Sequence, residues 1–592
     1  MIKPAHIHSS LRGDNALPLR PASQVMDLER LGAMHQSRLS FMRSLMRKVM
    51  LERWQIVLSC CDLDEKGHGT VVYQISAPYG VYSFVLFSNW LDPEQRNDRV
   101  IAEQWDLTMA LVAGKVDDHY LETLRKNVPK QEAGRVDSRV FVLSRANRSL
   151  RNFDYVVDTL AAGEQPDVQK IEQVGYLYRT TAVYGSGKLG MADWEKVQSR
   201  WPDFARPFSA EMFTCFMLRN FSLLQVEHIA RHQSPDTFSP MDITIKRYVG
   251  IGNSTGLGMA PFLIHHPLLF NQWIEMRELA LARVRVLGAV DSTIKKRFRK
   301  LLDRTTHHTR QTKTEDPWQS DHNIQVIKDL KALHKQSSQP FTRWGQLILW
   351  SEKNCSLQGQ ELLVSVLLEL YPELVNKLED YCSAEEFLDL DPIMPLQTLQ
   401  TVIEDRYDWA LTMDFIADGA RDIFWYRSEE KMEPRLGDAL KEKGKDRQMA
   451  LGVGYAVRKC YDQLLDYISE FPDHNTARFM VARPKLRGIV RRIQSMNRCL
   501  YGDIQANLLH RDVLPMHLLR AKLSFFGVSK FDPKSRLWVR NTMFQGAPLL
   551  EDIGGTFDDD WFMPLSPEYR SDETIAITST KTTKHTEEVA AL

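Results

Sequence analysis

The 592-residue sequence has no surplus of charge and no long apolar run. Lysine plus arginine and aspartate plus glutamate each number 76, so the formal net charge is zero. This balance argues against a protein whose main task is to coat nucleic acid or an anionic membrane. No run of about 18 apolar residues occurs, which predicts no membrane span. The N-terminus lacks the apolar core of a signal peptide.

Cysteine is scarce, and its spacing follows no known framework. The seven cysteines form an odd set without a C-x-x-C motif. We therefore expect neither a disulfide framework nor a thiolate zinc site, and a reducing cytoplasm fits best. Cys215 lies in the apolar context MFTCFML and is expected to be a buried small hydrophobe.

The common nucleotide and hydrolase motifs are absent as well. No Gly-Lys-Ser/Thr follows a glycine-rich loop at Walker A spacing, and Gly256-Leu257-Gly258 lacks the third glycine of a dinucleotide fingerprint. No G-x-S-x-G elbow occurs. These absences disfavour ATP and NAD without excluding them, and the sequence identifies no cofactor.

Three strand-like runs, 54–59, 70–76 and 81–88, are joined by short turn-like connections and predict an antiparallel meander. Helices near 100–112 and 145–161 are expected to cover one of its faces. Beyond residue 166 the periodicity is mainly helical, with a short strand candidate at 243–248.

These patterns predict an α+β, predominantly helical fold. A small N-terminal antiparallel sheet capped by helices is followed by a large helical body with Gly-rich loops. Length alone suggests about three to five domain-sized units. The expected divisions are a loose arm 1–24, an α+β domain 25–165, a helical domain 166–290, a basic linker 291–322, a helical C-terminal domain 323–564 and a disordered tail 565–592.

Two loops combine glycines with polar side chains. In the first, GIGNSTGLG, the glycines allow a ligand to approach the backbone, and successive N–H groups can form an anion-binding nest. Its candidate ligand-binding residues are Asn253, Ser254, Thr255 and Gly256. A connection in which these residues merely supply turn geometry is the alternative.

The second loop, YGSGKLG, begins at Tyr184 and contains Ser186 and Lys188. Tyr184 is a candidate binding residue, and Lys188 with Ser186 forms the candidate catalytic pair. A lysine there can bind an anion as a point charge, or act as a base or nucleophile if it is desolvated. A surface hairpin with a solvated lysine is the competing interpretation.

His228 and His232 are the weak candidates for metal ligands. Their i, i+4 spacing places both imidazoles on one helix face, which suits zinc or iron. Because H-E-x-x-H is absent and no third ligand lies nearby in the sequence, ordinary helix-face histidines are the favoured interpretation, and no metal is predicted.

The leading hypothesis is a cytoplasmic enzyme that acts on a small anionic metabolite, bearing carboxylate or phosphate, held by the two loops. The first alternative is a non-catalytic helical scaffold or regulator that binds protein or nucleic acid through the basic segments near 295–313 and 483–498. A metalloenzyme built on His228 and His232 is the second. The sequence predicts no membrane partner, argues against nucleic acid, and leaves a homo-oligomer open.

Overall fold

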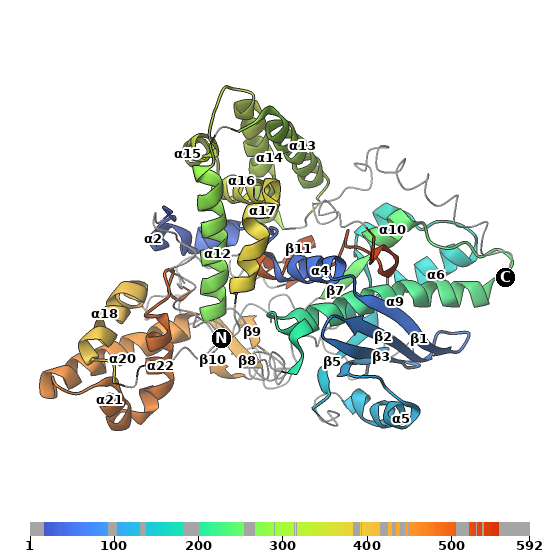
Figure 1. Cartoon of the computed structure of the whole chain (residues 1–592), viewed down its shortest axis with the longest axis horizontal. Coiled ribbons are helices and arrows are strands. Elements are labelled where there is room, and N and C mark those ends of the chain that lie inside the picture. The colour runs from blue at the N-terminus through green and yellow to red at the C-terminus, as the bar shows by residue number, and fades with distance from the viewer. Residues whose placement is uncertain are drawn as a thin grey trace.

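The computed structural model shows one large sheet with helices packed on it and two further groups of helices (Figure 1). The residues it describes are 17–92, 104–130, 138–180, 200–253, 267–288, 290–312, 314, 316–382, 391, 393–414, 424–428, 434–437, 444–447, 450–504, 520–521, 523–527, 530–535 and 538–555. Among the described helices, none combines the length and apolar character that crossing a membrane requires.

The large sheet has nine strands in the order β1-β2-β3-β4-β5-β6-β7-β12-β11. All neighbours are antiparallel except β6 and β7, which are parallel. The bounds are β1 Gln55–Leu63, β2 Gly69–Ala77, β3 Gly80–Ser88, β4 Leu107–Ala113, β5 Val140–Arg148, β6 Tyr176–Thr180, β7 Gly250–Asn253, β11 Lys530–Ser535 and β12 Trp538–Met543. The predicted meander is confirmed in β1 to β3, but the sheet is not small.

Helices cover both faces of this sheet. The long helix α9 (Ser209–Gln233) runs along one face, with α4 (Phe41–Leu51) and α6 (Phe153–Ala161) beside it. On the other face, α5 (Asp118–Asn127) packs Tyr120 and Leu124 against Val72, Val85 and Val112. Figure 1 shows the sheet between α9 and α5. The central strands are therefore buried on both sides.

Two further helical groups have cores of their own. One core joins α12 (Pro267–Val286), α13 (Ser292–Gln311), α14 (Pro317–Ser337), α15 (Trp344–Asn354) and α16 (Leu357–Leu370). The other joins α18 (Leu396–Arg406), α19 (Asp408–Thr412), α20 (Ala450–Glu470), α21 (Thr476–Ala482) and α22 (Arg487–Met496). The helical majority expected from the sequence is thus confirmed.

Smaller elements complete the described fold. The short helices are α2 Ala22–Val25, α3 Leu28–Ala33, α7 Val168–Glu172, α10 Ile243–Tyr248 and α17 Pro372–Val375. Single 3-10 turns are η3 Pro202–Phe204, η4 Asn376–Tyr381, η5 Pro484–Leu486 and η6 Leu550–Asp552. A three-stranded sheet contains β8 Phe424–Ser428, β9 Pro434–Gly437 and β10 Gly444–Arg447.

Several local predictions were wrong. Of the predicted helical stretches 100–112 and 145–161, residues 107–112 belong to strand β4 and residues 145–148 to strand β5, while residues 153–161 form the helix α6. Residues 243–248, a strand candidate, form the helix α10, because Asp242 caps it by accepting from the Thr244 N–H at 2.7 Å. The segment predicted as a basic linker contains helix α13, which buries Phe298, Leu301 and Leu302.

The start of the chain is also packed more tightly than predicted. Arg20, expected in a loose arm, is 6% exposed and forms ion pairs with Glu278 and Glu361 at 2.6 and 2.7 Å. Arg30 of α3 also pairs with Glu361 at 2.7 Å. These arginines join the N-terminal segment to α12 and α16.

Candidate functional site

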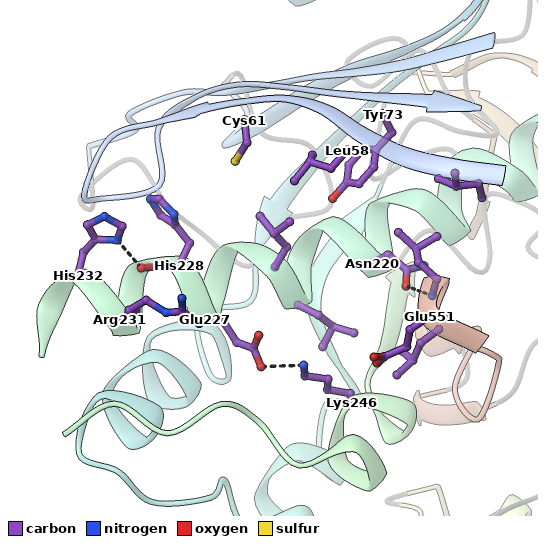
Figure 2. Close-up of a pocket in the computed structure, with 15 residues that line it drawn as sticks. Leu58, Cys61, Tyr73, Asn220, Glu227, His228, Arg231, His232, Lys246 and Glu551 are labelled. Atoms are coloured by element: carbon purple, nitrogen blue, oxygen red, sulfur yellow. Dashed lines mark hydrogen bonds and ion pairs between the residues drawn. The ribbon is translucent and has the colours of Figure 1, made fainter. Parts of the chain in front are cut away.

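A cavity of about 550 Å³ lies between the edge of the large sheet and helix α9 (Figure 2). Strands β1 and β2 supply one wall, α9 supplies the facing wall, and α10 and η6 supply the remainder. Its apolar side chains come from the sheet, from the middle of α9 and from the residues at η6, and its polar side chains come mainly from the end of α9 and from α10. The lining residues include Leu58, Cys61, Tyr73, Asn220, Leu223, Leu224, Glu227, His228, Arg231, His232, Lys246 and Glu551.

A β-bulge in β1 determines which side chains enter the cavity. Leu58 pairs with Tyr73 and Cys60 with Val72, so Ser59 is the extra residue, and its hydroxyl donates to the Val72 carbonyl at 3.0 Å. The extra residue reverses the alternation along β1. Cys61, paired with Val71, therefore lines the cavity, whereas Cys60 packs on the α5 side.

Tyr73 is the most deeply buried polar side chain of the cavity wall. It is 2% exposed, and its hydroxyl has no hydrogen-bond partner within the described part of the chain. Figure 2 shows the hydroxyl pointing from β2 toward α9, next to Leu58. Burial raises the pKa of this phenol well above its ordinary value, and the nearby Cys61 adds to the effect. The hydroxyl is therefore a neutral donor at physiological pH.

Cys61 is a poor nucleophile in this setting. Partial burial raises the pKa of its thiol, and Cys60 and Asp62 raise it further. Because the thiolate is the reactive form, a raised pKa leaves the thiol protonated at neutral pH.

One ion pair joins α9 and α10 along the cavity wall. The Lys246 ammonium lies 2.9 Å from the Glu227 carboxylate, which also accepts from the Met241 N–H at 2.9 Å. The charge of Lys246 is therefore compensated inside the cavity. Glu551 lines the cavity on the side away from His228 and Arg231, near Asn220 (Figure 2).

His228 and His232 share one face of α9, as their spacing predicted, with ring centroids 4.3 Å apart. His228 Nε2 lies 2.8 Å from the Asp64 carbonyl oxygen, and His232 Nδ1 lies 2.8 Å from the His228 carbonyl oxygen. A carbonyl only accepts, so these two nitrogens carry the protons. In the neutral rings, His228 Nδ1 and His232 Nε2 are then the nitrogens with a lone pair.

The two histidines do not complete a metal site within the residues described. No group of three or more histidine, cysteine, aspartate or glutamate side chains that could hold a metal ion occurs among them.

Arg231 differs from Lys246 because no carboxylate among the described residues pairs with it. Its guanidinium lies over the Phe238 ring, 5.0 Å from the ring centroid, and the residue is exposed at the cavity end that also carries His228 and His232. The cavity thus has one cation whose charge is not compensated by a neighbouring carboxylate.

The residues predicted from the two glycine-rich loops lie, with one exception, outside the described residues. Tyr184, Ser186, Lys188, Ser254, Thr255 and Gly256 lie outside the described residues. Asn253 is the last residue of β7, and it pairs with Asn541 in the strand register.

At two positions of the first loop, the structure explains why the residue is glycine. A Cβ on Gly252 would lie 2.4 Å from the Tyr176 ring, and one on Gly250 would lie 2.5 Å from the Met543 carbonyl oxygen. Both glycines therefore allow β7 to fit between β6 and β12. For these two positions, close strand packing explains the glycine without a ligand.

Several basic side chains of the segments 295–313 and 483–498, on which the scaffold alternative rests, form hydrogen bonds or ion pairs within the protein. Lys295 donates to the Phe341 carbonyl at 2.6 Å, and Arg299 donates to the Ser337 carbonyl at 2.9 Å. Arg492 forms a two-bond pair with Asp503, at 2.6 and 2.9 Å. These contacts account for part of the basic charge by internal pairing.

Sequence reasoning singled out His228 and His232 but missed Tyr73, Glu227, Arg231 and Lys246. In β2 the alternation of apolar residues marks Tyr73 as a core position, and no sequence signal indicates an unpaired hydroxyl. Arg231 lies in the last turn of α9, where a cation is expected for helix stability alone.

Comparison with protein-family models, with curated proteins and with solved structures found no match for this chain.

Proposed function

We propose that this protein binds a small amphipathic anion in the cavity beside α9. The anionic group, a carboxylate or phosphate, contacts Arg231, and the apolar body lies along Leu58, Leu223 and Leu224. The observation that carries the proposal is the guanidinium of Arg231, which no described carboxylate compensates, at one end of a cavity that Leu58, Leu223 and Leu224 also line.

Charge also supports one orientation of the ligand. Glu551 lines the far end of the cavity and repels an anion there, whereas Glu227 is neutralised by Lys246. The C-terminal end of α9 carries partial negative charge, so the helix itself does not attract the anion. The guanidinium, which presents a fork of donors to carboxylate or phosphate, supplies that attraction.

The proposal concerns binding of a metabolite-sized ligand, in keeping with the anionic molecule inferred from the sequence. Support for a binding role comes from the chemistry of the lining, because the Cys61 thiol is neutral and Glu227 is held in an ion pair. Apolar contacts would supply most of the affinity, and one charged contact would fix the orientation.

Decanoate tests the proposal by isothermal titration calorimetry, with decanol as the neutral ligand of similar size. We expect decanoate to bind and decanol to bind more weakly. Arg231→Gln should weaken decanoate by about 10-fold, the effect of losing a charge-assisted hydrogen bond. Lys335→Gln on α14, an exposed position elsewhere in the chain, removes the same charge and should leave binding unchanged. Equal effects of the two variants would refute the proposal.

A further inference from the structure

The Tyr73 hydroxyl is buried in the cavity wall, and no described residue forms a hydrogen bond with it. Its ring belongs to the core formed by the sheet and α9, where a phenylalanine would fill the same volume. Leaving a buried donor unsatisfied costs free energy that an apolar ring would not. Buried polar groups are nearly always paired, so a hydroxyl in a cavity wall without a partner among the described residues is a candidate contact for a ligand.

The hydroxyl lies away from the charged end of the cavity. Figure 2 shows Tyr73, Asn220 and Glu551 toward one end and His228, His232 and Arg231 toward the other. Asn220 and Arg231 are 11 positions apart on α9, which corresponds to roughly 16 Å along the helix axis. A ligand that spans the cavity therefore meets Arg231 with one end and the region of Tyr73 with the other.

Other polar groups at the Tyr73 end are already engaged. The Asn220 side chain donates to the Phe216 carbonyl at 2.8 Å and accepts from the Leu550 N–H at 3.2 Å. Glu551 is a carboxylate, which excludes a second anionic group there. The chemistry that suits this end is a neutral oxygen that accepts from Tyr73.

Leu58 lies next to the Tyr73 hydroxyl (Figure 2). It is the cross-strand partner of Tyr73, lines the cavity and is 40% exposed, so its side chain has room to rotate. Bulk water does not reach the buried hydroxyl oxygen. A ligand chain that displaces the Leu58 side chain would reach it.

We infer that the ligand is an apolar chain with an anionic group at one end and a neutral hydroxyl or carbonyl oxygen toward the other, which accepts a hydrogen bond from Tyr73. Tyr73 is then a specificity-determining residue. The inference rests on the proposed function, because it assigns the second contact of the same ligand.

Three pairs of probes test it by calorimetry: octanoate, decanoate and dodecanoate, each beside its ω-hydroxy counterpart. For the chain that spans the cavity, the wild-type protein should bind the hydroxy acid about 3- to 10-fold more tightly than Tyr73→Phe does. The parent acid should bind both proteins within about 2-fold, since a hydrogen bond to Tyr73 is absent there. Tyr79→Phe, at an exposed tyrosine, is the matched control and should change neither ligand.

The outcomes separate the two proposals. Suppose that the parent acids bind and that their binding depends on Arg231. If Tyr73→Phe then weakens no hydroxy acid more than its parent acid, the role of Tyr73 is refuted, whereas the proposed binding of an anion in the cavity is supported. If no parent acid binds, or if Arg231→Gln has no effect on any of them, the proposed function fails and the inference fails with it.

Discussion

His35 is the residue whose surroundings most directly predict a pH effect. Its Nε2 atom is buried without a hydrogen-bond partner in the described structure. Burial lowers the pKa of the imidazole from 6.5 to about 3, with help from the positive charges of Arg520, Arg277 and His308 and against that of Glu361. The folded protein therefore holds His35 neutral at a pH where the unfolded chain protonates it.

The sign of the effect follows from this difference. Between pH 6.5 and about 3, the unfolded state binds more protons at His35, so the free energy of unfolding falls as the pH falls. The loss is at most about 1.4 kcal/mol per pH unit. His35→Gln should remove this contribution, while His119→Gln, at an exposed site on α5, should retain it. Urea unfolding at several pH values measures it, and equal slopes for wild type and His35→Gln would contradict it.

At the scale of elements, the N-terminal segment depends on a buried carboxylate of α16. Glu361 accepts from Arg20 and Arg30 and pairs with Arg277 at 2.7 Å, and its side chain is fully buried. These arginines lower the pKa of Glu361 strongly, although burial opposes them. The carboxylate is therefore the ionised centre that joins α3, α12 and α16.

Glu361→Gln should lower the free energy of unfolding by about 3 kcal/mol or more, because it removes the carboxylate that the buried guanidinium groups of Arg20, Arg30 and Arg277 share. Hydrogen exchange should rise first in α2 and α3. Glu122→Gln on α5, which breaks pairs with Arg125 and Lys126 at a half-exposed site, should cost about 0.5 kcal/mol or less. Similar losses in the two variants would show that the buried network does not stabilise the segment.

The elements also show which patterns a sequence reveals. The meander β1 to β3 was predictable, because its strands alternate and its turns are short. In β4 the run LTMALVA is apolar throughout, since α9 and α5 cover both faces, and such a run does not distinguish strand from helix. In α10, Ile243 and Ile245 imitate strand alternation, and the cap from Asp242 decides for a helix.

The candidate site was less predictable than the fold for a related reason. His228 and His232 lie close in sequence, so their common helix face follows from spacing alone. The cavity, however, is assembled from residues of β1, β2, α9, α10 and the end of the described chain. Tyr73 and Arg231 are candidates because, among the described residues, the Tyr73 hydroxyl has no hydrogen-bond partner and the Arg231 guanidinium has no carboxylate partner. Only the folded structure shows this.

At the scale of the whole molecule, the last described strands, β11 and β12, belong to the same large sheet as β1 to β7. Strand β12 pairs with β7, and the Arg219 guanidinium of α9 donates to the Ala547 and Pro548 carbonyls at 3.1 and 2.8 Å. Leu549 and Leu550 line the cavity. The sequence pattern predicted a separate C-terminal domain over residues 323–564. Within that range, β12 and residues 547–550 pack with the large sheet.

The packing of residues 530–555 against the sheet and α9 predicts the effect of shortening the chain. Deleting residues 530–592 removes β11, β12 and the 547–550 contacts, so it exposes the β7 edge and leaves the buried Arg219 without two of its acceptors. We expect a loss of about 3 kcal/mol or more in the free energy of unfolding, and loss of decanoate binding. Deleting only 556–592 keeps every one of these contacts and is the matched control. If both truncations bind decanoate like the full chain, the 530–555 segment contributes nothing to the cavity, and the wall formed by Leu549 and Leu550 is not needed for the ligand.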